Sequence, residues 1–151
     1  MSQTHITVYT YRMANPINVF LIDDDASVRN GLTRLLRAAR YEVQPFSSAD
    51  DFLDALKSSQ RRARELCGCL VLDANTPGLS GVDLATELKR HGFRLPIVVV
   101  ATDNDYATRQ KALNMKAIGF FRKPIDGTAL LDAVDWAHQS YYAERARKPG
   151  Y

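Results

Sequence analysis

Short apolar segments alternate along this chain with longer segments in which apolar residues recur at helical spacing. The apolar segments predict buried strands at residues 17–22, 41–46, 69–72, 96–101 and 117–121. The periodic segments predict helices at residues 26–39, 47–56, 82–91, about 103–115 and 127–142. Because strand and helix alternate and crossovers are right-handed, we expect an α/β fold with a doubly wound, five-stranded parallel sheet.

Polar residues and glycine mark where several of these helices begin or end. Asp25 precedes the first helix as a candidate N-cap, and Ser47 and Ser48 precede the second. Gly92 follows the third helix as a C-cap, and one of the residues 103–105 can cap the fourth. These local signals agree with the hydrophobic pattern.

Length and composition fit one domain and exclude several classes of protein. The chain has 151 residues and is 46% hydrophobic, which is enough for one core. We expect a poorly ordered N-terminal extension at 1–16, the domain at 17–143, and a basic tail or truncated linker at 144–151. A net charge of +3 is too mild to indicate direct nucleic-acid binding.

The chain carries no segment that predicts a membrane location or export. No apolar run approaches the length that spans a bilayer, and the N-terminus lacks the layout of a signal peptide. Cys67 and Cys69 are too close for a useful disulfide and too few for a metal site. We therefore expect reduced thiols and a cytoplasmic protein.

Charged side chains follow three of the predicted strands at the point where each strand ends. Asp23 and Asp24 follow the first strand, Asp73 ends the third, and Lys123 follows the fifth. The carboxyl ends of parallel strands meet at one edge of a sheet, where ligands bind. Clustered carboxylates need a cation to stay ionised, and oxygen ligands suit Mg²⁺. The pattern indicates a carboxylate that accepts a phosphoryl group, with Mg²⁺ and a lysine offsetting the charge.

Each of these residues also has a plainer interpretation. Asp25 fits an N-cap better than a metal ligand, and Asp23 and Asp24 could both be helix-start residues. Two consecutive acids directly at a strand end favour the metal site over capping alone. Lys123 by itself would be a surface lysine, but Pro124 restricts the backbone that presents it.

Three separated motifs resemble the receiver domain of two-component response regulators. They are Leu21–Arg29, Leu72–Asp73 with Thr76–Gly81, and Phe120–Pro124. The resemblance covers residues 17–143 and implies the flavodoxin-like (βα)5 receiver fold. Residues 48–53 look most like the subfamily that is fused to helix-turn-helix output domains.

The resemblance implies a role for each matching residue. Asp73 would accept the phosphoryl group from a histidine kinase, and Asp24 and Asp73 would bind Mg²⁺ directly. Asp23 would act on the metal mainly through water, and Asn75 would offer its backbone carbonyl. Lys123 would pair with a phosphoryl oxygen.

The same resemblance assigns the switch. Its aromatic position falls at Phe120, and the peptide bond between Lys123 and Pro124 is cis in this family.

The chain departs from the family pattern at the switch position. The family has Ser or Thr at the end of the fourth strand, where this chain has Ala101. Thr102 stands one position later, where the backbone N–H faces the phosphate in the family, so Thr102 would bind a phosphoryl oxygen through its backbone or its side chain. Its side chain points the other way unless the strand bulges. Thr76 stands where Met is usual. Either Thr102 replaces the missing hydroxyl, or the coupling is weakened or rerouted; we favour the second.

We expect a phosphoacceptor signalling domain and not an enzyme. Its output would use the face formed by the fourth helix, fifth strand and last helix, through homodimerisation or partner docking. An unphosphorylated pseudo-receiver that serves as an interaction scaffold is the first alternative, supported by Ala101.

The enzyme alternative is a haloacid-dehalogenase-like phosphatase. It would use Asp23 as nucleophile and Asp25 as acid/base, but it leaves Asp73 and the Pro77-Gly78 turn unexplained.

Overall fold

A computed structural model describes residues 17–58, 68–78 and 81–147. Five strands alternate with five helices in the described ranges. The strands are β1 (Asn18–Ile22), β2 (Glu42–Phe46), β3 (Gly68–Asp73), β4 (Ile97–Ala101) and β5 (Gly119–Arg122). The helices are α2 (Ala26–Ala38), α3 (Ala49–Ser58), α4 (Gly81–Arg90), α5 (Tyr106–Asn114) and α6 (Gly127–Arg147).

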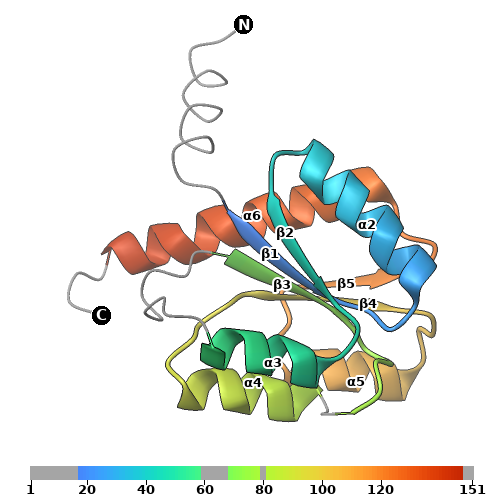
Figure 1. Ribbon diagram of the computed structural model, residues 1–151, viewed down its shortest axis with the longest axis horizontal. Helices are drawn as coiled ribbons and strands as arrows, with labels where there is room; N and C mark the ends of the chain where they lie inside the picture. The colour runs from blue at the N-terminus through green and yellow to red at the C-terminus, as the bar shows by residue number, and fades with distance from the viewer. Residues whose placement is uncertain (1–16, 59–67, 79–80, 148–151) are drawn as a thin grey trace, which may run out of the picture.

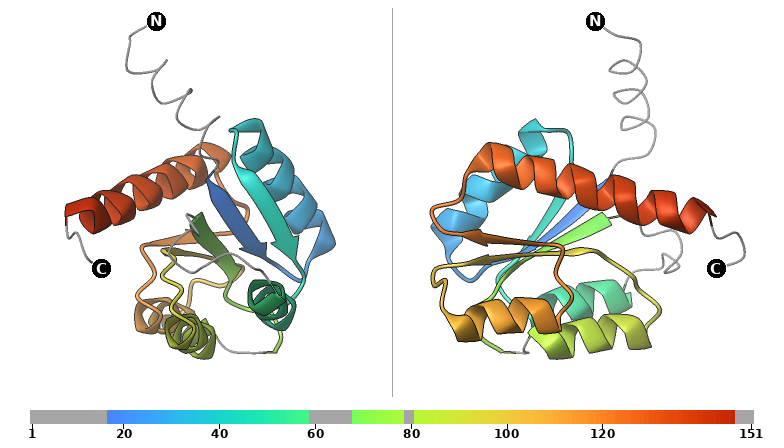
Figure 2. Two further views of the ribbon diagram at one scale, coloured as in Figure 1. Left: turned by 60° about the vertical axis from the view of Figure 1, so that its left-hand side comes forward. Right: turned by 180° about the vertical axis from the view of Figure 1, so that it is seen from behind.

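The strands form one parallel sheet in the order β2-β1-β3-β4-β5 (Figure 1). Helices α3, α4 and α5 cover one face, and α2 and α6 cover the other (Figure 2). This is the predicted doubly wound fold. The order reverses at β1, so β1 and β3 lie side by side and their carboxyl ends meet at the same edge of the sheet, where ligands bind in such folds.

Alternating residues of the central strands contribute side chains to two hydrophobic cores, one on each face of the sheet. Phe20 and Ile22 of β1 pack with Phe52 on the side of α3, α4 and α5. Val19 and Leu21 point to the opposite face, toward α2 and α6. The central strands are buried on both faces, which explains why their sequences are apolar without alternation.

The element boundaries differ from the sequence predictions mainly at the C-terminus. Helix α6 continues to Arg147, whereas the hydrophobic pattern predicted an end at Tyr142 and a tail from residue 144. Residues 143–147 are good helix formers, and the next proline is Pro149, so the helix continues past its apolar stripe. The predicted extension at 1–16, the polar segment at 59–65 and Cys67 lie outside the described residues.

Several predicted caps are confirmed. The Asp25 carboxylate accepts hydrogen bonds from the backbone N–H groups of Ser27 and Val28, so Asp25 is the N-cap of α2. Asp105 caps α5 through the N–H of Thr108. Hydrogen bonding by the Thr108 side chain, and next by its backbone N–H, lowers the pKa of the Asp105 carboxyl. In the described parts of the chain, no helix combines the length and apolar character needed to cross a bilayer.

Candidate functional site

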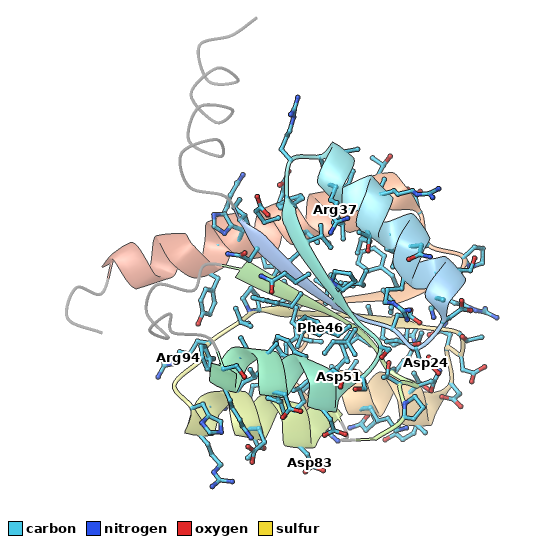
Figure 3. The ribbon with its side chains drawn as sticks, in the orientation of Figure 1. Asp24, Arg37, Phe46, Asp51, Asp83 and Arg94 are labelled. Atoms are coloured by element: carbon cyan, nitrogen blue, oxygen red, sulfur yellow. The ribbon has the colours of Figure 1, made fainter. Side chains whose placement is uncertain are left out.

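The site lies at the carboxyl edge of the sheet, where β1, β3 and β5 end. Ile22 pairs with Leu72, so Asp23 and Asp73 each stand one residue beyond a matched pair. Lys123 follows β5, and its N–H donates to the Ala101 carbonyl of β4 over 2.8 Å. Figure 3 shows Asp24 at this edge, beyond the end of β1. The parallel register therefore brings together residues that are 50 positions apart.

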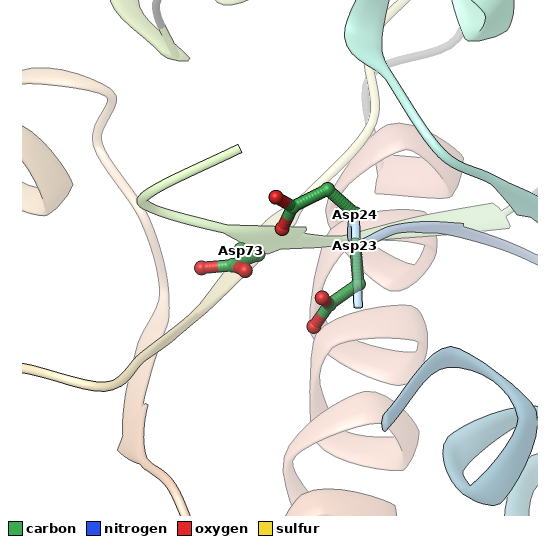
Figure 4. A group of neighbouring side chains, drawn as sticks. All are labelled: Asp23, Asp24 and Asp73. Carbon is green, nitrogen blue, oxygen red and sulfur yellow. The ribbon is translucent and has the colours of Figure 1, made fainter. Parts of the chain in front are cut away.

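Three carboxylates gather there. Asp23, Asp24 and Asp73 each offer an oxygen, and these atoms lie within 4.8 Å of one another. Asp23 and Asp24 project to opposite sides of the strand end, beside Asp73 (Figure 4). Asp23 and Asp73 are buried, whereas Asp24 is exposed. The cluster thus has a solvent-facing side at Asp24.

Lys123 is the cation that joins the two buried carboxylates. Its Nζ lies 2.9 Å from Oδ2 of Asp23 and 3.2 Å from Oδ2 of Asp73. Burial lowers the pKa of the Lys123 amine, but the Asp23 and Asp73 carboxylates outweigh it and the net pKa is raised. Lys123 is therefore positively charged at neutral pH. The Lys123–Pro124 peptide bond is cis.

The surroundings of Asp23 disfavour the ionised form of its carboxyl. Burial raises the pKa of the Asp23 carboxyl, and the negative charge of Asp73 adds to this; Lys123 and the Asp25 N–H act in the opposite direction. The net result is a raised pKa. A second cation near Asp23 would offset this cost.

The residues present fit a Mg²⁺ ion. The candidate ligands are all oxygens from carboxylates, which a hard cation prefers. Oδ2 of Asp23 is buried and, among the described residues, accepts no hydrogen bond of normal geometry beside its ion pair with Lys123. A buried oxygen with unused acceptor capacity is suited to metal coordination directly or through a water molecule.

Backbone hydrogen bonds hold the two acidic loops in place. The Asp23 N–H donates to the Phe46 carbonyl over 3.1 Å, and the Asp25 N–H donates to Oδ1 of Asp23 over 2.9 Å. On the other loop, the Asn75 N–H donates to Oδ1 of Asp73 over 3.0 Å. The carbonyl role predicted for Asn75 stays a prediction.

The end of β4 is regular. On one side of β4, Val100 pairs with Asp73 of β3. On the other side, Ala101 pairs with Arg122 of β5, and both registers are unbroken. Ala101 is fully buried, and Thr102 lies exposed beyond the strand. The described register thus contains no bulge that would turn Thr102 inward.

Two arginines contact the site region. Arg29 ends the first receiver motif, Leu21–Arg29, but neither Arg29 nor Arg109 was assigned a site role from the sequence. Nη1 of Arg29 in α2 donates to the backbone carbonyl of Asp23 over 2.7 Å. The Arg109 guanidinium of α5 lies 6.0 Å from the ring centre of Phe120, and its Nε donates to Asn104. Both contacts depend on long side chains whose partners are not encoded by local spacing.

Thr76 introduces a hydroxyl close to the acceptor. Its N–H donates to the Asp73 carbonyl over 3.2 Å. The Thr76 hydroxyl oxygen is buried and has no hydrogen-bond partner among the described residues. The structure does not otherwise explain why threonine stands here.

Comparison with known proteins adds the family. Residues 19–135 match the family model of the response regulator receiver domain. The transcriptional regulatory protein TdiR of Thauera aromatica is 39% identical over 126 residues, which is 83% of this chain and 53% of TdiR. Nodulation protein W of Bradyrhizobium diazoefficiens is 39% identical over 116 residues, 77% of this chain and 48% of that protein.

Solved structures agree with the sequence comparison. The response regulator StyR superposes with a TM-score of 0.74 at 39% identity, covering 88% of this chain and 64% of StyR. Full-length FixJ from B. japonicum gives 0.68 at 30% identity, covering 85% of this chain and 62% of FixJ. The chain spans about half the length of the curated relatives it matches.

Proposed function

The chain belongs to the response regulator receiver domain family, and on that premise we propose that it accepts a phosphoryl group on Asp73 in a Mg²⁺-dependent reaction. The observation that carries this proposal is the contact of one lysine with two buried carboxylates. Nζ of Lys123 reaches Oδ2 of both Asp23 and Asp73 at 2.9 and 3.2 Å. A site of this charge pattern can exchange a lysine–carboxylate contact for a lysine–phosphoryl contact.

The proposed reaction transfers a phosphoryl group from a histidine nitrogen of the kinase to an oxygen of Asp73. A carboxylate oxygen of Asp73 attacks phosphorus and a new P–O bond forms, while the P–N bond of a histidine kinase's phosphohistidine breaks. The electron pair of that bond stays on the nitrogen, and a ring that carries a proton on its other nitrogen leaves as neutral imidazole. Lys123 stays charged, because its pKa is raised, and can bind a phosphoryl oxygen. Asp24 and Asp73 would hold Mg²⁺ directly, with Asp23 acting through water and the Asn75 carbonyl as a further ligand. The ion would offset the charge that develops on the phosphoryl oxygens.

The test uses small phosphodonors in place of an unidentified kinase. The full chain is incubated with Mg²⁺ and acetyl phosphate, or with phosphoramidate, which carries a P–N bond, and its intact mass is measured. Wild type should gain one phosphoryl group and Asp73→Asn none. The matched control is Asp54→Asn, an exposed acid on α3, which should gain the group as wild type does. A folded wild type that binds Mg²⁺ without gaining mass would favour the interaction scaffold.

The output surface belongs to the same proposal. Three large apolar side chains are exposed on α5 and α6: Tyr106 at 80%, Leu113 at 66% and Trp136 at 59%. Helices α5 and α6 flank the edge strand β5. We propose that this α5–β5–α6 face binds a second copy of the chain, since large exposed apolar side chains on both flanking helices suit a contact surface. Sedimentation with and without acetyl phosphate should detect a dimer that Leu113→Ser weakens; a monomer under both conditions would exclude this assembly.

The readout of phosphorylation is proposed to be rerouted. Ala101 supplies no hydroxyl, and Thr102 is exposed outside β4. Arg109 instead contacts both Asn104, in the loop after β4, and Phe120 of β5. It therefore connects the loop next to the site with the candidate switch aromatic without a hydroxyl at position 101.

The relatives suggest what the output controls. TdiR and FixJ are named as transcriptional regulatory proteins. We propose that this domain likewise controls transcription, and that the DNA contacts lie outside the receiver domain.

A further inference from the structure

We propose that Arg29 is a positioning residue that holds Asp24 in place for Mg²⁺ by fixing the peptide group in front of it. This inference deepens the proposed function and rests on it for the identity of the metal site. Arg29 touches neither Asp73 nor a substrate in the described structure. Its role would be exerted through the backbone of the loop between β1 and α2.

The first step is that no described residue anchors the side chain of Asp24. It is exposed, and no described residue donates a hydrogen bond to its carboxylate. Asp23, by contrast, is held through its N–H, through Oδ1 and through Oδ2. Because no described residue donates a hydrogen bond to the Asp24 carboxylate, the position of Asp24 depends on its backbone.

The second step is that Arg29 controls that backbone. Its Nη1 donates to the carbonyl of Asp23 over 2.7 Å, a charge-assisted hydrogen bond. The carbonyl of Asp23 and the N–H of Asp24 belong to one planar peptide group. Fixing the carbonyl therefore fixes the direction in which the chain enters Asp24.

The third step is that Arg29 is itself held. Its backbone N–H donates to the carbonyl of the N-cap Asp25 over 2.9 Å, and its own carbonyl accepts from the Thr33 hydroxyl over 2.7 Å. The guanidinium thus extends from the first turn of α2 back over the loop. An ordered helix provides a rigid base for a bond to a loop.

The positive charge of Arg29 is unfavourable at its position in α2, unless the nearby acidic site offsets it. A cation near the N-terminus of a helix is disfavoured by the helix dipole, and α2 has no acidic residue in its first turn. Three carboxylates lie in front of that turn. The arginine therefore contributes a second positive charge to the acidic site, beside Lys123.

These two effects of Arg29 have opposite consequences for Mg²⁺, and this makes the inference testable. A purely electrostatic Arg29 repels the cation, so its removal would strengthen Mg²⁺ binding. A positioning Arg29 orders a ligand, so its removal would weaken binding, by about tenfold if it resembles other groups that orient metal ligands. The sign of the change separates them.

The experiment is a Mg²⁺ titration of the full chain without phosphodonor, followed by the NMR amide signals of Asp24 and Asn75. Arg29→Met should raise the Mg²⁺ dissociation constant about tenfold. The control is Arg34→Met, which removes the same charge from the same helix. Arg34 is exposed and makes no described contact with the loop. It should leave the dissociation constant near that of wild type. Equal or tighter binding by Arg29→Met would overturn the inference.

A second variant covers the case in which Arg29→Met does not fold. Arg29→Lys keeps the charge, but its ammonium ends one bond earlier and lacks the planar fork. It should still bind Mg²⁺ more weakly than wild type, and wild-type affinity would overturn the inference.

The wild type separates this inference from the proposed function. If wild type binds Mg²⁺ and is never phosphorylated, the proposed function fails and the inference on Arg29 stands. If wild type is phosphorylated and Arg29→Met binds Mg²⁺ unchanged, the inference alone fails.

Discussion

Nζ of Lys123 lies 3.2 Å from Oδ2 of Asp73, although the two residues are 50 positions apart in the chain. The same Nζ contacts Asp23 at 2.9 Å. One cation thus stabilises two buried anions at the end of the sheet. Any change in the charge of Asp73, including phosphorylation, alters one of the two carboxylate contacts of Lys123.

Removing the lysine should destabilise the fold when no divalent cation is present. Lys123→Met leaves the buried Asp23 and Asp73 carboxylates uncompensated, and we expect a loss on the order of 3 kcal/mol in the free energy of unfolding. Urea denaturation in EDTA measures it, with the exposed Lys111→Met as control. Added Mg²⁺ should recover part of the loss, since ligand binding stabilises the folded state. Unchanged stability of Lys123→Met in EDTA would contradict this account.

Removing the buried charge of Asp23 should have the opposite effect on stability. Burial raises the pKa of Asp23, so its ionised form opposes folding, and Asp23→Asn should stabilise the chain at pH 7 in EDTA. Mg²⁺ binding should weaken in the same variant. The measurement is urea denaturation as a function of pH.

The pH dependence of this gain follows from the direction of the shift. Because the folded pKa of Asp23 is raised above 3.8, wild type loses relative stability as the pH rises from about 3.8 through the folded pKa. The advantage of Asp23→Asn should therefore be full above the folded pKa and disappear in acid. A stability difference that is independent of pH would argue against this origin.

Restoring a hydroxyl at position 101 should restore coupling at a cost in packing. Ala101 is fully buried, so Ala101→Thr should lower the free energy of unfolding by about 1–3 kcal/mol. In the phosphorylated protein, the amide signals of β5 and α5 should shift more in this variant than in wild type. Thr102→Ala, on the exposed neighbour, should change neither quantity. Equal shifts in Ala101→Thr and wild type would exclude a missing hydroxyl as the limiting feature.

Arg109 should order the ring of Phe120. Arg109→Ala removes the cation that lies 6.0 Å from the ring centre and the hydrogen bond to Asn104, at a cost of about 1 kcal/mol. Urea denaturation measures the stability, and aromatic NMR signals report the ring. Lys111→Ala removes an exposed cation from the same helix and serves as control. A Phe120 signal that is identical in Arg109→Ala and wild type would remove Arg109 from the proposed readout.

The loop after Asp73 should depend on one glycine. Gly78 has a φ of 100°, and a Cβ there would lie 3.2 Å from Oδ2 of Asp50. Gly78→Ala should cost about 1–2 kcal/mol, because an L-residue is strained at this φ. Gly31→Ala in α2, where no atom lies within 4 Å of the added Cβ, should gain about 0.5–1 kcal/mol. Thermal unfolding of the two variants checks both signs.

The sequence alone determined the architecture and the acidic site. Apolar runs and helical periodicity are local properties, and parallel strands leave little freedom in where their carboxyl ends meet, so Asp23, Asp24 and Asp73 could be expected to converge. The N-cap role of Asp25 was equally local, because an N-cap bonds to residues two and three positions away. The catalytic and metal-binding roles of these residues remain predictions.

Only the tertiary structure decided which long side chains support that site. An arginine at a helix start can reach solvent, another helix or a loop, and the bond of Arg29 to the Asp23 carbonyl follows from how α2 lies on β1. The contact of Arg109 with Phe120 likewise requires the placement of α5 beside β5. The regular register of β4 also left Thr102 outside the strand. The spacing of such residues in the sequence follows neither the helix nor the strand period. Their contacts therefore form only when the elements pack together.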